Sequence, residues 1–290
     1  MSSAPAVALR RVVERAYART PITAPPAVRN AYLRWTTDDD FGAFDHPPDP
    51  FAVRWFDPDR IECFTGRPYP PYRNRASLLG SVREGDWDRR TDPPIVDDDY
   101  RGRYDLYRAD RFSDSVFFES VRAHFEDNVD WQDTPFVERC LALAERGEQS
   151  WRSLSSRGAI LDRCGTIDEL YEAIRTDGYR SQRALGERSL LAITEEIVVD
   201  IGRDGTPLFV NGRHRLAIAK LLGLERVPVG VLVRHADWMA TRDAYARRDG
   251  HVPDHPDLVD VPRSEATGPS DRATSQSPRA GSDRRTDHDR

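Results

Sequence analysis

The sequence contains almost no lysine: Lys220 is the only one among the 43 lysine and arginine residues of a 290-residue chain. Acidic residues number 49, which gives a formal net charge of -6. A GC-rich genome alone replaces lysine with arginine, whereas an acidic, lysine-poor surface suits a cytoplasm at high salt. We interpret the two together as the signature of a halophilic protein. Salt then screens long-range attraction to nucleic acid, which is a disfavoured partner for a negatively charged chain.

Cysteine is also scarce, and long apolar runs are absent. Cys63, Cys140 and Cys164 are odd in number, widely separated and without a CxxC pair. This argues against a disulfide framework and a structural zinc site, so we predict no metal site of that kind. No stretch approaches the roughly 18 consecutive apolar residues of a membrane span, and residues 1–11 lack the apolar core of a signal peptide. We therefore expect a cytoplasmic protein without membrane contact.

Composition and periodicity divide the chain into four regions. Residues 1–112 are rich in proline, aspartate and aromatic residues, and we expect an irregular extension that wraps around a core. Residues 113–154 show helical periodicity, with caps at Ser113 or Asp114 and a helix start at Pro135. Residues 155–248 form the core domain. Residues 262–290 have hardly an apolar side chain and are predicted to be a disordered tail.

The pattern within 155–248 predicts a compact α+β domain, in which a helix, a β-hairpin, a helix and a strand follow one another. The expected elements, in chain order, are a helix opened by a capping box at 166–169 and ended by Gly178, strands at 196–201 and 208–210 joined by a turn at 203–206, a helix at 213–222 ended by Gly223, a buried strand at 227–233 and a helix at 237–248.

Basic side chains crowd the first turn of the helix at 213–222, where Arg213, His214 and Arg215 follow Asn211 and Gly212. A helix N-terminus carries partial positive charge and normally prefers Asp or Glu. Cations are tolerable there if an anion lies between them, and helix N-termini bind phosphate readily. We therefore predict a phosphorylated ligand, with Arg215 as the bidentate contact and Asn211 as the helix cap. The alternative is that the three basic side chains point into solvent or pair with surface carboxylates.

One ordered set of features stands out between Ile167 and Val233: a helix ending at Gly178, then Gln182, a hairpin, the turn Gly212-Arg213-His214-Arg215, Leu222-Gly223 and Val227-Pro228-Val229. In this order they resemble the domain of the ParB and sulfiredoxin superfamily, over roughly a quarter of the chain. The resemblance implies a nucleotide whose phosphates lie against Gly212, His214, Arg215 and the backbone amides that follow. The base is not identified.

Members of this superfamily include CTP-switched DNA clamps, sulfinic acid reductases, amino-acid kinases and reported nucleases, and this chain departs from several of them. Arg213 stands where sulfiredoxin-like members carry a catalytic cysteine, and Asn211 stands where kinase-like members carry aspartate. A single helix and a tail follow the domain, whereas partition proteins continue with a helix-turn-helix reader. Whether the chain is an enzyme therefore stays open.

Three functions remain. The first is a nucleotide- or phosphate-binding protein, whose ligand is a nucleotide or a phosphorylated small molecule. The second is a phosphoryl-transfer or phosphodiester-hydrolysing enzyme, with Glu195 or Glu196 as base and Mg²⁺ as cofactor. The third is a DNA- or protein-binding adaptor with a vestigial phosphate site. Arg180 and Gln182 follow a helix end and line the same pocket in the first two cases, or belong to a polar loop. The oligomeric state is not predicted.

Overall fold

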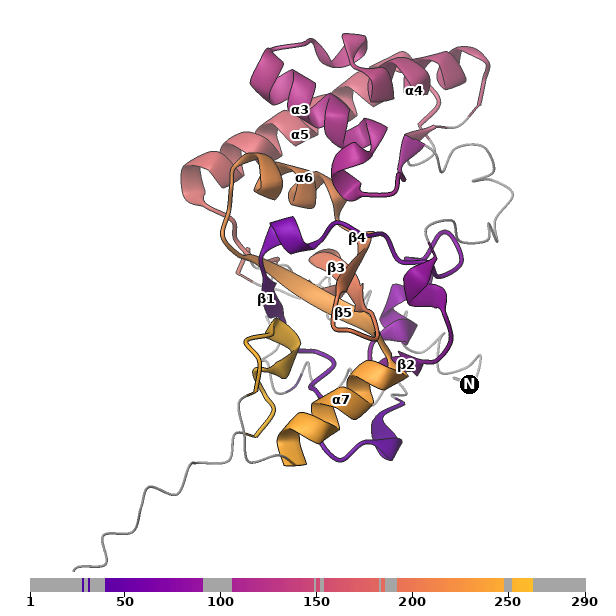
Figure 1. The fold of residues 1–290 in the computed structure, drawn as a ribbon. Coiled ribbons are helices and arrows are strands. Elements are labelled where there is room, and N and C mark those ends of the chain that lie inside the picture. Colours follow the sequence, from indigo (N-terminus) through magenta and orange to yellow (C-terminus); the bar gives the residue numbers. More distant parts are fainter. Residues whose placement is uncertain are drawn as a thin grey trace, which may run out of the picture.

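The computed structural model describes residues 28, 31, 40–90, 106–148, 150–151, 154–182, 184–185, 192–247 and 252–262. The architecture is mixed α+β. A five-stranded mixed sheet lies below a layer formed by helices α3 (Val116–Asp127), α4 (Pro135–Glu145) and α5 (Arg157–Asp177) in Figure 1. Residues 1–27 and the predicted tail from 263 onward fall outside the described residues. Within the described ranges, no helix has the length and apolarity needed to cross a membrane.

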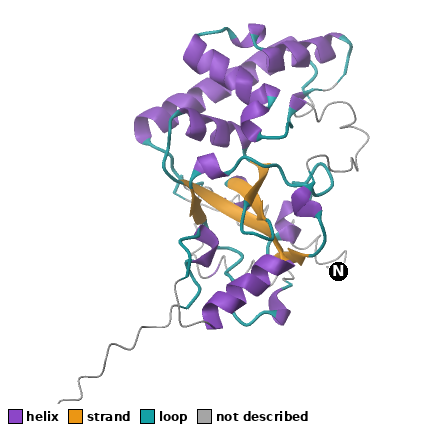
Figure 2. Cartoon of the chain, in the orientation of Figure 1, coloured by secondary structure: helices purple, strands orange, loops and turns teal. Residues whose placement is uncertain are grey.

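The central strand of the sheet is β5 (Val227–His235), all nine residues of which are buried. On one edge β3 (Ile197–Ile201) pairs parallel to it, and β4 (Pro207–Asn211) continues antiparallel to β3 as the predicted hairpin. On the other edge β1 (Arg54–Phe56) pairs antiparallel and β2 (Ser81–Arg83) pairs parallel. Figure 2 shows these short strands beside the longer ones. The sheet is therefore completed by the N-terminal region and is not confined to 155–248.

Successive side chains of β3 and β4 pack into two separate apolar clusters. Ile197, Val199 and Phe209 belong to the cluster that continues into the helical layer, whereas Val198 and Leu208 belong to a smaller cluster on the other face. A strand buried on both faces favours a continuous apolar run, which explains residues 227–233 of β5; the buried Arg234 that follows is compensated by its pair with Asp257.

Helix α6 (Arg213–Leu221) lies between the helical layer and the sheet (Figure 1). Lys220, near its C-terminus, has a side chain that is only 5% exposed; its Nζ lies 2.5 Å from Oε1 of Glu62 and 3.7 Å from Oδ1 of Asp59. The single lysine of the chain thus ties α6 to the segment that follows β1. This ion pair, a hydrogen bond from Ser113 and the charge of Lys220 outweigh burial and lower the pKa of Glu62.

Two helix starts differ from the prediction. Helix α3 is capped by Ser115, whose hydroxyl accepts a hydrogen bond from the Phe118 amide at 3.2 Å, so neither Ser113 nor Asp114 is the cap. Helix α5 is capped by Ser156 and begins ten residues before the predicted capping box. Thr166 lies inside this helix, where its hydroxyl bonds to the preceding turn. The helix starts of α4 at Pro135 and of α6 at Arg213 are confirmed, as is the helix end at Gly178.

A buried charge cluster fastens helix α7 (Ala236–Arg247) and the short helix η11 (Pro256–Leu258) to the sheet. Asp257 is fully buried and accepts two hydrogen bonds from Arg234, at 2.9 and 2.6 Å. Arg242 donates to the Asp257 carbonyl and to Asp260, and Arg54 also donates to Asp260. Burial alone raises the pKa of the Asp257 carboxyl, but the three guanidinium groups hold that pKa far below its usual range. The carboxylate therefore stabilises the fold above about pH 4, and this contribution is lost on further acidification.

We expect Asp257→Asn to lower the free energy of unfolding by about 3–5 kcal/mol, because it leaves buried guanidinium groups without their counter-charge. Urea denaturation in molar potassium chloride measures the change. Glu172→Gln is the matched control, since its pair with Arg175 is more than half exposed on both sides and contributes little. Equal stability of the two variants would contradict a structural role for the cluster.

His255 is buried next to this cluster in the neutral form. Its Nε2 donates to the Gly205 carbonyl at 2.9 Å, and its Nδ1 accepts from the Asp257 amide at 3.1 Å. The ring lies against Trp238, with 4.6 Å between the ring centroids. Burial lowers the pKa of His255, against the opposing effects of the Gly205 carbonyl and Asp257.

Because the folded-state pKa of His255 lies below the unfolded value of about 6.5, stability is complete above that pH and falls as the pH drops below it. One such group contributes a slope of at most about 1.4 kcal/mol per pH unit. We expect His255→Phe to be less stable at neutral pH and to show a shallower decline between pH 6.5 and 5. Unfolding curves at intervals across this range test it, and parallel declines in both proteins would refute it.

Candidate functional site

The turn between β4 and α6 is built around Gly212. This residue is the N-cap of α6 with φ +95°, a left-handed conformation that suits glycine. A Cβ atom at Gly212 would lie 2.9 Å from the Ile197 Cα and 3.3 Å from the Glu196 carbonyl oxygen. Asn211 is the last residue of β4, and no side chain caps the helix, so the prediction that Asn211 caps it is wrong. The first turn of α6 therefore packs directly on the start of β3.

Arg213 and His214 contact aromatic rings of the helical layer. The Arg213 guanidinium carbon lies 4.0 Å from the centroid of the Tyr107 ring and 5.7 Å from that of Phe117. The His214 ring stacks on Trp151 with centroids 5.6 Å apart and meets Phe117 edge-on at 5.3 Å. These side chains do not simply point into solvent, which removes that alternative for both. They join α6 to the helical layer through cation–π and stacking contacts.

Arg215 faces a different set of polar groups. Glu196 is fully buried, and its Oε1 accepts a hydrogen bond from the Gln182 amide at 2.8 Å. The Tyr179 hydroxyl lies within electrostatic reach of both Arg215 and Glu196: burial raises the pKa of Tyr179, Glu196 raises it further, and Arg215 opposes the rise. The structure therefore brings the backbone of Gln182 and the side chain of Glu196 together, whereas a contact of Gln182 with a ligand stays a prediction. Arg180 is exposed and bonds to the Ala184 carbonyl at 3.4 Å.

The two arginines each retain a buried guanidinium nitrogen without a hydrogen-bond acceptor. These atoms are Nη1 of Arg213 and Nη1 of Arg215, among the residues that the structure describes. A buried donor left unsatisfied costs about 1–3 kcal/mol. No acidic residue occurs in the first turn of α6 to balance the two charges. An anion at the helix N-terminus would accept hydrogen bonds from the uncapped amides of the helix and from a guanidinium group that reaches it.

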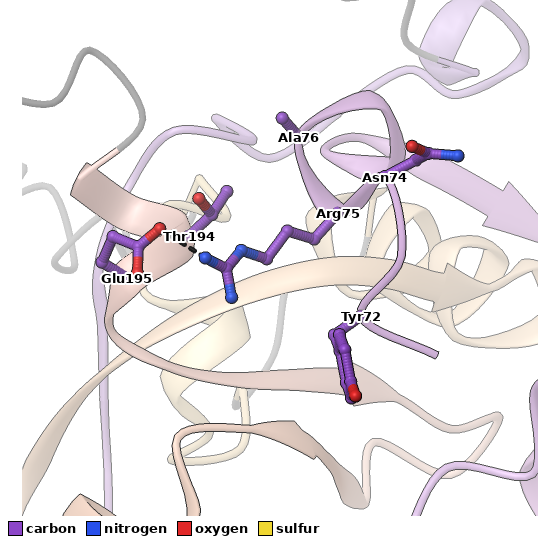
Figure 3. Close-up of a pocket in the computed structure, with 6 residues that line it drawn as sticks. All are labelled: Tyr72, Asn74, Arg75, Ala76, Thr194 and Glu195. Carbon is purple, nitrogen blue, oxygen red and sulfur yellow. Dashed lines mark hydrogen bonds and ion pairs between the residues drawn. The ribbon is translucent and has the colours of Figure 1, made fainter. Parts of the chain in front are cut away.

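Glu195 and Glu196 diverge although they are adjacent in sequence. Glu195 ends the short helix η10 (Ala192–Glu195) and forms an ion pair with Arg75, which begins η3 (Arg75–Leu78). Both side chains line a pocket of about 400 Å³ together with Tyr72 and Asn74 (Figure 3). Of the two candidate bases, Glu196 therefore belongs to the start of α6 and Glu195 to a separate pocket.

The buried thiols lack the ionisation of reactive cysteines. Burial raises the pKa of Cys140 to about 11 and that of Cys164 to about 12, and all three cysteines are free. In the parts of the chain that the structure describes, no three His, Cys, Asp or Glu side chains are grouped as metal ligands. His255 is no free metal ligand, since it bonds to the backbone through both ring nitrogens.

Sequence reasoning did not identify Tyr179 or Arg75 as members of these sites. Tyr179 directly follows the helix-ending Gly178, and that adjacency was the available signal. Arg75 lies 120 residues from Glu195, so no local pattern could join the two. No protein-family model matches the chain, and neither the curated proteins nor the solved structures include a match to it.

We expect Gly212→Ala to destabilise the protein more than Gly223→Ala. Both glycines have positive φ, +95° and +60°, so each substitution carries a backbone cost of about 1–2 kcal/mol. A Cβ at Gly223 has no neighbour within 4 Å, whereas a Cβ at Gly212 would clash with Ile197. Urea denaturation of the two variants measures the difference. If both variants lose the same free energy of unfolding, the close packing of α6 on β3 does not contribute to stability.

Proposed function

We propose that this protein binds a nucleotide or another phosphorylated ligand at the N-terminus of α6, with Arg215 as its principal cationic contact. The observation that carries the proposal is the pair of buried guanidinium nitrogens at the first turn, on Arg213 and Arg215, which lack an acceptor among the described residues. Phosphate oxygens are the acceptors that suit guanidinium groups and helix amides together.

The aromatic contacts assign different tasks to the two arginines. Arg213 is held over the Tyr107 ring, so its remaining nitrogen is presented in a fixed direction. Arg215 lies within electrostatic reach of Tyr179, and in the described part of the chain its guanidinium is not held over an aromatic ring as that of Arg213 is. We therefore assign the direct phosphate contact to Arg215 and a supporting contact to Arg213. The resemblance to the ParB and sulfiredoxin superfamily agrees with a phosphate at this turn and belongs to the same proposal.

A second function, phosphoryl transfer or phosphodiester hydrolysis, is favoured by the position of Glu196. The residue is fully buried, and its backbone carbonyl oxygen would lie 3.3 Å from a Cβ at Gly212, in the turn that would hold the phosphates. One carboxylate suits Mg²⁺, which keeps several waters and is held mainly by phosphate oxygens. Bound there, the cation would neutralise phosphate charge, while Glu196 would accept a proton from the attacking hydroxyl or water.

We expect Arg215→Ala to weaken binding of inorganic pyrophosphate or a nucleoside triphosphate by about tenfold or more, the equivalent of at least about 1.4 kcal/mol. Isothermal titration calorimetry in molar potassium chloride with Mg²⁺, over the four ribonucleoside triphosphates, measures the loss. Arg175→Ala removes an exposed arginine on α5 and is the matched control. Arg215→Lys retains the charge without the fork of donors and should fall between the two.

Three outcomes separate the functions. Binding that is lost in Arg215→Ala, without phosphate release, supports the binding protein. Mg²⁺-dependent phosphate release that is abolished in Glu196→Gln supports the enzyme. If wild-type protein binds no phosphorylated ligand, the turn serves to join α6 to the helical layer, and the adaptor with a vestigial phosphate site takes its place.

A further inference from the structure

The pocket between η3 and η10 is packed against the central strand of the sheet, and an ion pair lines one side of it. Gly230 of β5 lies so close to η10 that a Cβ there would be 2.5 Å from the Ile193 carbonyl oxygen, so η10 rests directly on the central strand. Thr194 is only 2% exposed, and Tyr72 packs against the smaller apolar cluster of the sheet. The walls of the pocket are thus anchored to the most buried part of the fold, although its mouth is open to solvent.

The charged wall is the ion pair between Arg75 and Glu195. Nη2 of Arg75 donates to Oε1 of Glu195, and Figure 3 shows the guanidinium extended from η3 toward the carboxylate of η10. The side chains are 25% and 41% exposed, respectively. In the described part of the chain, the other guanidinium nitrogens of Arg75 and Oε2 of Glu195 make no further hydrogen bond. The pocket therefore presents two or more donors beside an acceptor, and Tyr72 belongs to another part of its lining (Figure 3).

This arrangement matches the edge of one nucleobase. Guanine carries the acceptors N7 and O6 followed by the donors N1–H and N2–H₂, whereas adenine, cytosine and uracil alternate or reverse this order. A guanidinium recognises N7 and O6 in a bidentate manner. A carboxylate beside it would accept from N1–H and N2–H₂. The volume of about 400 Å³ also falls within the range of about 300–1,000 Å³ that small-molecule pockets occupy.

The pocket and the start of α6 are joined by consecutive residues of the chain. Glu195 lines the pocket, and the next two residues, Glu196 and Ile197, contact Gly212. We infer that the pocket binds guanine, with Arg75 on N7 and O6, Glu195 on N1–H and N2–H₂, and Tyr72 stacked on the base. The inference rests on the proposed function in one respect, because it assigns the phosphates of the same nucleotide to the first turn of α6.

Base analogues test each contact in the pocket without involving the phosphate site. Equilibrium dialysis of guanosine, adenosine, inosine and 7-deazaguanosine against the full chain in molar potassium chloride gives their relative affinities. We expect guanosine to bind about tenfold or more tightly than adenosine. Inosine, which lacks N2–H₂, and 7-deazaguanosine, which lacks N7, should each bind several-fold more weakly than guanosine.

Substitutions then assign each analogue effect to a residue. In Glu195→Gln the preference for guanosine over inosine should shrink, and in Arg75→Met the preference over 7-deazaguanosine should disappear. Glu172→Gln and Arg175→Met alter an exposed ion pair on α5 and should leave all four affinities unchanged. Equal affinities for guanosine and adenosine, or unchanged preferences in both pocket variants, would overturn the inference.

A binding measurement with pyrophosphate separates this inference from the proposed function. If pyrophosphate binding depends on Arg215 but the nucleosides bind with equal affinity, the guanine pocket is overturned and the phosphate site is supported. Guanosine binding that depends on Arg75 and Glu195, without pyrophosphate binding, would support the pocket and remove the phosphate site. Guanosine diphosphate binding more tightly than either fragment, with losses in both Arg75→Met and Arg215→Ala, supports a single nucleotide that spans the two.

Discussion

The close approach of Gly212 to the start of β3 is the constraint on which both candidate sites depend. A side chain at this position would overlap the Ile197 Cα, so the first turn of α6 lies at backbone contact distance from the strand. That contact places Arg215 beside the region of Glu196 and Tyr179. It also fixes where η10 ends, because Glu195 directly precedes the two residues on which Gly212 packs. Backbone packing, rather than a bond between side chains, positions the charged groups.

Arginine chemistry explains much of the rest of the fold. Guanidinium groups form bidentate pairs with carboxylates and stack on aromatic faces, which an ammonium group does poorly. The buried pairs Arg67–Asp200 and Arg234–Asp257 use the first property, and Arg213 over Tyr107 uses the second. A composition that replaces lysine with arginine therefore supplies a core rich in directed ion pairs. The single lysine is the exception, since Lys220 reaches Glu62 as a point charge at the end of α6.

Local signals predict the segment from β3 to α7, the start of α4 at Pro135 and the helix end at Gly178, but not the two short strands or the start of α5. Apolar runs, Gly212 and Gly223 mark the hairpin, helix and strand, because each element is defined by neighbours in sequence. Strands β1 and β2 have three residues each and exist through pairing with β5, more than 140 residues away, so their sequence carries little signal of its own. The start of α5 was predicted too late because a capping-box pattern also fits inside a continuous helix, where Thr166 bonds to the preceding turn.

The same distinction applies to the site. The crowding of basic residues at α6 is visible in the sequence, but their partners come from distant segments. Tyr107 and Trp151 contact Arg213 and His214, whereas Tyr179 lies within electrostatic reach of Arg215 and Glu196. Two adjacent glutamates then lie in different surroundings: Glu196 is buried within the fold, whereas Glu195 pairs with Arg75 at an open pocket. A molecule that satisfied both environments would need an anionic end for the helix and a neutral edge, with acceptors beside donors, for the pocket. Phosphate attached to a planar base combines these properties in one small molecule, and neither environment alone would select it.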